Sequence, residues 1–256
     1  VDAYHDPGFG QTVQWDIPLL DGYTHQFLSL KNSIQGVEWA VVSPLFRRRF
    51  DVLLVHGYNS LTNLLAILVA KLSGTKVLMR GDTRWEMHHK RTGLKALFKR
   101  IVFRCCDGFV AIGSLNREYY LQHGVPAERI FFAPFSVRNE LFAASSDVRA
   151  LHRRNILVDL ALEGESDVHI VLFASKLIKR KRADDLIRAF AMLADQFPAA
   201  YLLIVGSGEE EPNLRALAAA STCSRVRFMG FRNQSQLPAI YAASDIFVLP
   251  ADSEPW

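Results

Sequence analysis

Short apolar runs alternate with longer amphipathic segments along most of the chain, and this alternation predicts an α/β protein. In the N-terminal half, the apolar runs expected to form buried strands are 51–56, 76–80, 108–112 and 129–132. The segments with helical periodicity between them are 60–72, 94–106 and 114–123. Continuous apolar strands separated by amphipathic helices are typical of βαβ units with a parallel sheet.

The C-terminal half repeats the same pattern. Its expected strands are 169–174, 201–205, 225–228 and 246–249, and its expected helices are 183–196, 212–220 and 234–243. The stretch between the halves is less regular. We therefore expect two Rossmann-like domains, residues 1–140 and 167–256, joined by a linker at 141–166. The carboxyl ends of their sheets would face a cleft, the edge at which open α/β sheets bind ligands.

Composition narrows the class of protein. The 256 residues carry a net charge of +4 and no apolar run near the ~20 residues that span a bilayer. The three cysteines have no metal-binding spacing, and we expect them to be reduced thiols in a cytoplasmic protein. No nucleic-acid motif is present, so the basic runs favour a phosphorylated small ligand or a lipid surface. The first residue is Val1 and no signal segment follows it, so we expect a piece of a longer protein.

The basic segment 176–182 is the strongest local signal. It follows an expected strand, carries five cationic residues and leads directly into a helix. A helix N-terminus is already electropositive, so added cations repel one another there unless an anion offsets them. A solvated basic loop is the alternative, but the position at the end of a strand favours a phosphate site.

Gly206 and Gly208 follow the next strand in a Gly-x-Gly turn. Three glutamates come directly after it, and no third glycine does, which argues against a nicotinamide or flavin dinucleotide. A plain strand-to-helix turn and a glycine turn that lets a phosphate approach the backbone remain equally supported.

Three polar residues lie at the carboxyl edge of the expected N-terminal sheet. His56 ends one strand, and Arg80 and Asp82 end or follow the next. They could face a bound acceptor, or they could be a structural histidine and an ion-paired turn. The adjacent His88 and His89 diverge, and no Asp-x-Asp motif occurs, so we expect no metal site.

The segment 94–104 is an amphipathic helix with two interpretations. Four apolar residues, Leu94, Leu97, Phe98 and Ile101, recur at helical spacing, with cations on their flanks. Packing against the core is the favoured interpretation. Contact with an anionic membrane surface is the alternative.

Taken together, these segments resemble the family-four retaining glycosyltransferases of GT-B fold. In that family a basic residue and a lysine five positions later follow the first strand of the C-terminal domain, and Lys176 and Lys181 have this spacing. The family's first residue is usually arginine, so Lys176 is a departure. The glycine turn at Gly206 and Gly208 and the pair Gly230-Phe231 also resemble family segments, the latter lining the nucleotide base.

The resemblance extends to both ends of the chain. The run 241–250 is similar to the segment that leads into the family's donor loop, and Glu254 matches the first of its two glutamates. The chain stops before the second glutamate and lacks the closing helices. His56, five residues after Asp51, matches a strand-ending histidine that approaches the donor sugar.

What the resemblance implies is hexosyl transfer with retention, from a nucleoside diphosphate sugar to a hydroxyl acceptor in surface polysaccharide or glycolipid synthesis. Lys176, Lys181, Glu254 and His56 would be catalytic and Arg180 would bind the donor. No cofactor is expected beyond the sugar nucleotide. The piece itself could be inactive. A GT-B epimerase and a non-catalytic sugar-nucleotide-binding fragment stay open as alternatives. The expected location is the cytoplasm, with peripheral contact at the inner membrane face.

Overall fold

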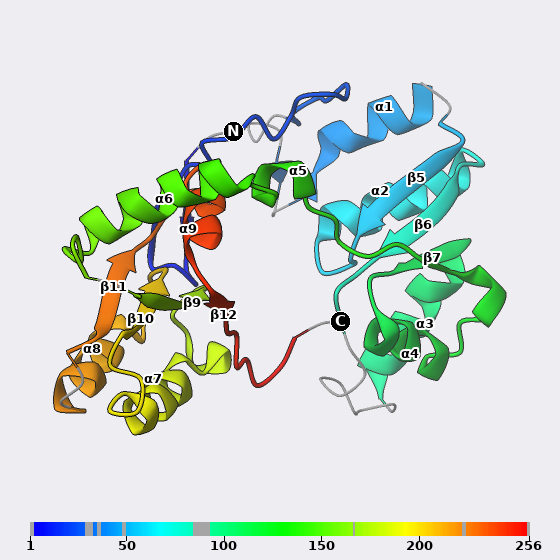
Figure 1. The fold of residues 1–256 in the computed structure, drawn as a ribbon. Helices are drawn as coiled ribbons and strands as arrows, with labels where there is room; N and C mark the ends of the chain where they lie inside the picture. The colour runs from blue at the N-terminus through cyan, green and yellow to red at the C-terminus, as the bar shows by residue number, and fades with distance from the viewer. Residues whose placement is uncertain are drawn as a thin grey trace. The chain divides into compact units, whose positions relative to one another are not determined.

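The computed structural model describes residues 3–28, 33–34, 37–47, 50–83, 93–165, 167–221 and 224–254. The chain forms two compact units (Figure 1). The N-terminal unit is His25–Ser136, and the C-terminal unit combines the segment up to Thr24 with Val137–Glu254. These units place the first segment with the C-terminal half of the chain, whereas the sequence suggested the N-terminal domain. The linker limits inferred from the sequence stay a prediction.

The N-terminal unit contains a parallel sheet of four strands in the order β5-β6-β7-β8. Its strands are β5 (Val52–His56), β6 (Lys76–Arg80), β7 (Gly108–Ala111) and β8 (Ile130–Phe132). Its helices are α1 (Val42–Arg47), α2 (Leu61–Leu72), α3 (Leu94–Cys105) and α4 (Ser114–Gln122). A short pair, β3 (Ser33–Ile34) and β4 (Val37–Glu38), precedes them.

Buried polar contacts join the loops of this unit to its apolar core. Asn116 is fully buried on α4; its Oδ1 accepts a hydrogen bond from Ile112 N at 3.2 Å, and its Nδ2 donates to Thr83 O at 2.6 Å. Met79 and Phe109, paired on neighbouring strands, are buried in the core of the same unit. Because a buried amide needs partners for both its donor and its acceptor, Asn116 fixes the loops after β6 and β7.

The C-terminal unit contains a second parallel sheet, in the order β11-β10-β9-β12. Its strands are β9 (His169–Ala174), β10 (Ala200–Val205), β11 (Val226–Gly230) and β12 (Ile246–Phe247). Its main helices are α6 (Ser146–Asp159), α7 (Ala183–Leu193), α8 (Glu211–Ala220) and α9 (Leu237–Ala243). A single turn, α5 (Asn139–Phe142), precedes α6.

Helices cover both faces of this sheet, which explains why its central strands are apolar throughout. Side chains that alternate along β9 enter two separate cores. Ile170 and Leu172 pack with residues of α6 and α9, while Phe173 packs with residues of α7 and α8. Figure 1 shows the two pairs of helices on opposite sides of the sheet.

A hairpin of β1 (Tyr4–Asp6) and β2 (Gln11–Val13) also belongs to the C-terminal unit. These strands have three residues each and no apolar run, so the sequence pattern did not predict them. The two parallel sheets with flanking helices confirm the predicted α/β class. No helix among the described residues is long and apolar enough to cross a bilayer.

The helix 94–104 packs on the core through another face than expected, and the expectation that Leu94, Leu97, Phe98 and Ile101 are its packed residues is wrong. Leu94 is 85% exposed, and Leu97, Phe98 and Ile101 are 46–56% exposed. Val102 and Phe103 are the residues of α3 that are buried. The helix has two apolar faces, and the one that the sequence pattern singled out is turned to solvent.

Candidate functional site

The basic turn after β9 is folded around Glu254. Residues Lys179–Lys181 form one 3-10 turn, which ends at Arg182 in the left-handed conformation, with φ 53°. Lys181 Nζ lies 2.5 Å from Glu254 Oε1, and Arg180 Nη1 lies 3.5 Å from Glu254 Oε2. The Lys181 and Glu254 side chains are only 13% and 18% exposed, so solvent screens their attraction weakly. The carboxylate therefore holds both cations on one side of the turn.

Backbone contacts fasten the last described segment to the same turn. Asp252 N donates to Arg180 O at 2.9 Å, and the Arg180 guanidinium donates to Ser253 O. The structure thus brings together Arg180, Lys181 and Glu254, which the sequence had placed in one site.

Lys176 has a different partner, which the sequence analysis did not find. Its Nζ lies 2.8 Å and 2.9 Å from the carboxylate oxygens of Asp6, in the hairpin β1–β2. Asp6 also accepts hydrogen bonds from the N–H groups of Gly8, at 2.8 Å, and Phe9, at 3.1 Å. The hydrogen bond from Lys176 and these two N–H groups hold the pKa of Asp6 below its usual value, although burial acts in the opposite direction.

At Gly206 and Gly208 two loops approach each other so closely that only glycine fits. Gly206 has φ +135° and Gly208 has φ +157°. A Cβ at Gly206 would lie 1.9 Å from Ser175 O, and one at Gly208 would lie 2.4 Å from Leu177 O. The turn after β10 therefore packs directly on the backbone of the turn after β9. The expected phosphate contact of these glycines stays a prediction.

Phe231 lies among aromatic residues of the first segment. Its ring centre is 5.0 Å from that of Phe9 and 6.5 Å from that of Trp15. A pocket of about 120 Å³ is lined by these three rings together with Gly206 and residues of the neighbouring turns. Gly230, which precedes Phe231, has φ +69° and accepts a hydrogen bond from Gly206 N at 2.8 Å.

Polar contacts anchor the first segment over the carboxyl edge of this sheet. Ser207 Oγ donates to Phe9 O at 2.9 Å, and Asn233 Nδ2 donates to Gln14 O at 2.7 Å. The hairpin and the residues after it thus form part of the wall around Lys176 and Phe231.

The residues predicted at the N-terminal sheet edge also lie together. Parallel pairing sets His56 beside Arg80 at the carboxyl ends of β5 and β6. Both line a pocket of about 330 Å³ with Asp82. The Arg80 guanidinium lies 4.7 Å from the ring centre of Phe135 and donates to Ala133 O at 3.4 Å, while its buried Nε has no hydrogen-bond partner among the described residues.

Within the described residues, no three His, Cys, Asp or Glu side chains form a group that could hold a metal ion. His88 and His89 lie outside those residues. The expectation that no metal takes part stays a prediction.

Comparison with solved structures identifies the class of fold. HepE from Anabaena, in its complex with UDP and glucose, matches with a TM-score of 0.64 at 17% identity over 85% of this chain and 57% of that chain. A glycosyltransferase from Rickettsia africae matches with a TM-score of 0.63 at 18% identity over 86% of this chain and 58% of that chain. These likenesses confirm the GT-B fold class.

Sequence comparison finds similarity to one family over the C-terminal part of the chain. Residues 161–256 match the family model described as "Glycosyl transferases group 1". The lipopolysaccharide core biosynthesis glycosyltransferase LpsE of Rhizobium meliloti is 36% identical over 104 residues, which are 40% of this chain and 29% of that protein. A GDP-mannose-dependent mannosyltransferase of Corynebacterium glutamicum is 39% identical over 82 residues, 32% of this chain and 21% of that protein. The C-terminal part of the chain is therefore similar to the group 1 glycosyltransferases, and the matched segments cover less than a third of the length of these two relatives.

Proposed function

We propose that the protein transfers a hexose from a nucleoside diphosphate sugar to a hydroxyl acceptor with retention, in the synthesis of a glycolipid or surface polysaccharide. The relatives support this class of substrate by their names, which include lipopolysaccharide core synthesis and a phosphatidylinositol mannoside mannosyltransferase. The observation that carries the proposal is the cluster that Arg180 and Lys181, of the turn between β9 and α7, form with Glu254.

The role of the cations follows from the negative charge that develops on the departing diphosphate. The bond between the anomeric carbon and the diphosphate breaks, and the diphosphate departs with the electron pair. The acceptor oxygen then bonds to the anomeric carbon from the same face, and its proton passes to the departing phosphate. Cations fixed beside the diphosphate stabilise this charge without reorganisation. Lys181, held by Glu254, supplies such a fixed cation.

Lys176 would serve the same diphosphate in competition with Asp6. The ammonium already has a carboxylate within 3 Å, so an incoming diphosphate either shares Lys176 with Asp6 or displaces it. Phe231 would contact the nucleotide base. For the N-terminal unit, we propose that His56 positions the transferred sugar and that Arg80 and Asp82 bind the acceptor.

We further propose that α3 contacts an anionic membrane surface. Its apolar residues Leu94, Leu97, Phe98 and Ile101 are exposed, the helix carries four cations and it has no acidic residue. This combination suits a helix that lies on an anionic bilayer. Co-sedimentation with phosphatidylglycerol vesicles tests this contact. Loss of binding in L97S/I101S supports it, and equal binding by that variant contradicts it.

Incubation with isotope-labelled UDP-glucose and GDP-mannose tests the reaction. Sugar transfer or slow hydrolysis, with release of the nucleoside diphosphate, is the expected result. An epimerised donor would indicate the alternative epimerase, and binding without turnover would indicate a binding fragment.

A further inference from the structure

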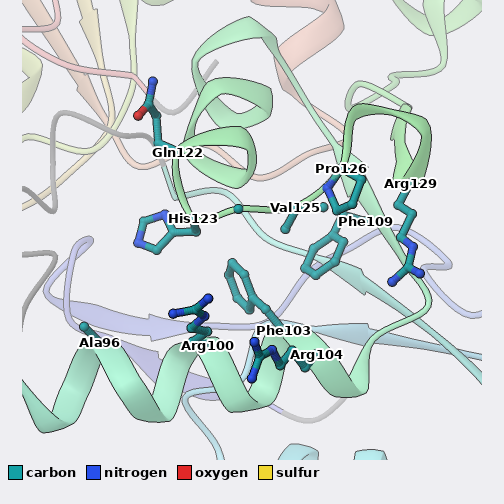
Figure 2. Close-up of a pocket in the computed structure, with 11 residues that line it drawn as sticks. Ala96, Arg100, Phe103, Arg104, Phe109, Gln122, His123, Val125, Pro126 and Arg129 are labelled. Atoms are coloured by element: carbon teal, nitrogen blue, oxygen red, sulfur yellow. The ribbon is translucent and has the colours of Figure 1, made fainter.

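Besides the pocket of His56 and Arg80, the N-terminal unit has a pocket lined by basic residues at the opposite edge of its sheet. It has a volume of about 380 Å³ and lies between α3 and the segment that joins α4 to β8 (Figure 2). In a parallel sheet the helices return the chain to the amino ends of the strands. The end of α3 and the turn before β8 therefore meet at the amino-terminal edge, away from the predicted transfer site.

Three arginines line this pocket, and no carboxylate is among its described lining residues. Arg100 and Arg104 come from α3, and Arg129 comes from the 3-10 turn before β8. In the part of the chain that the structure describes, no Asp or Glu oxygen lies within 4.0 Å of their guanidinium groups. Figure 2 shows Arg100 rising from α3 toward His123, and Arg129 directed toward the pocket from the opposite wall.

The position of Arg104 has a structural explanation that does not extend to Arg129. A cation in the last turn of α3 is favoured by the partial negative charge of the helix C-terminus. Arg129 belongs to another element, and it adds its charge to the same pocket without an ion pair to a carboxylate of the described residues. Three like charges around one hollow repel one another, and a bound anion would relieve that repulsion.

The rest of the pocket is ordered and partly apolar. Buried side chains of Phe103, Phe109 and Val125 line it. His123 Nδ1 lies 2.7 Å from the carbonyl oxygen of Tyr119, so this nitrogen must carry the proton that it donates. His123 Nε2, at 3.2 Å, can then accept a hydrogen bond from Lys99 Nζ. These contacts fix one wall of the pocket before any ligand arrives.

We propose that this pocket binds a phosphate group carried by a ligand whose carbon part lies against the apolar lining. Arginine is the residue best suited to phosphate because its planar guanidinium donates two parallel hydrogen bonds. Arg100 and Arg104 each lie three positions after an exposed apolar residue of α3, Leu97 and Ile101, and residues so spaced are neighbours on a helix. The phosphate could therefore belong to a membrane lipid headgroup or to a free molecule.

The test compares the full chain with two charge variants. R104Q/R129Q removes two pocket cations, one of them on α3. The control K95Q/R117Q also removes one cation of α3, and neither of its residues lines the pocket. Each protein is titrated with inorganic pyrophosphate by calorimetry and sedimented with vesicles of phosphatidylglycerol in phosphatidylcholine. Pyrophosphate that binds at the Lys181 turn contributes equally to both variants, so their difference reports the pocket. Because all four substituted side chains are exposed, both variants should fold, which thermal unfolding verifies.

We expect R104Q/R129Q to lose about tenfold or more in affinity relative to K95Q/R117Q in at least one arm, the scale of two charge-assisted hydrogen bonds. A loss in the pyrophosphate arm indicates a free phosphate ligand, and a loss confined to the vesicle arm indicates a lipid headgroup. Equal binding by the two variants in both arms overturns the proposal. Because neither arm involves sugar transfer, this result is independent of the proposed reaction.

Discussion

The ammonium of Lys176 lies 2.8 Å and 2.9 Å from the two carboxylate oxygens of Asp6, a residue 170 positions earlier in the chain. In the turn predicted to bind a diphosphate, one lysine is thus already paired with a carboxylate of the protein itself. The second lysine, Lys181, is paired in the same way with Glu254. Both lysines are oriented by carboxylates before a donor binds.

Replacing Asp6 with asparagine should lower stability and relieve competition for Lys176. We expect a loss of about 1–2 kcal/mol in the free energy of unfolding at neutral pH, because Lys176 and two N–H groups lose a charged acceptor. Nucleoside diphosphate binding should become tighter, since Lys176 is then available to the phosphates. Unfolding and calorimetric titration of D6N measure the two effects. Weaker binding would mean that Asp6 positions Lys176 for the donor instead of competing for it.

The Asp6 contribution to stability should depend on pH in one direction. The pKa of Asp6 is lowered in the folded protein from an ordinary value of 3.8. Its contribution is therefore fully present above that value and is lost as the pH falls through the lowered pKa. The difference in unfolding free energy between the wild-type protein and D6N should shrink below about pH 4. A difference that stays constant from pH 7 to pH 3 would contradict this assignment.

Alanine at Gly206 should destabilise the C-terminal unit far more than alanine at an unconstrained glycine. The added Cβ would overlap Ser175 O at 1.9 Å, in a backbone conformation that side chains rarely adopt. We expect a loss of about 3 kcal/mol or more. Gly164, with φ +87° and open space where a Cβ would lie, is the control, with an expected cost of about 1 kcal/mol. Similar unfolding curves for G206A and G164A would argue against the close loop contact.

Asp107 should contribute to the stability of the N-terminal unit through its contacts at the start of β7. Its Oδ2 accepts hydrogen bonds from Val77 N at 2.8 Å and from Lys71 Nζ at 3.0 Å. Alanine would leave the Val77 N–H without this acceptor, at an expected cost of about 2 kcal/mol. Asparagine keeps a neutral acceptor and should cost less. Chemical denaturation of both variants checks this order, and an equal loss would assign the effect to the ion pair alone.

The sequence predicted the sheets better than the site. Continuous apolar runs fix β6 and β9 at the residues expected, because a strand buried on both faces leaves an unambiguous pattern. The orientation of α3 was wrong because Val102 and Phe103 give the helix a second apolar face, and periodicity cannot say which face is buried.

The site was only partly predictable, because a sequence pattern shows which residues end a strand but not which distant segments pack together. The pairing of Lys181 with Glu254 could be anticipated because both residues end or follow strands at one sheet edge. The pairing of Lys176 with Asp6 could not, because nothing in a local pattern indicates that a hairpin of two three-residue strands packs on a turn far along the chain.

The most direct test of the central claim, that the turn after β9 binds a diphosphate, is the affinity for UDP and GDP of the wild-type protein, K181Q and K179Q. Lys179 is an exposed lysine of the same turn and serves as the control. The account predicts that the wild-type protein binds at least one of the two nucleotides, that K181Q binds it about tenfold or more weakly, and that K179Q stays within about twofold. Equal affinities of K181Q and K179Q, or no binding of either nucleotide by the wild-type protein, would contradict it.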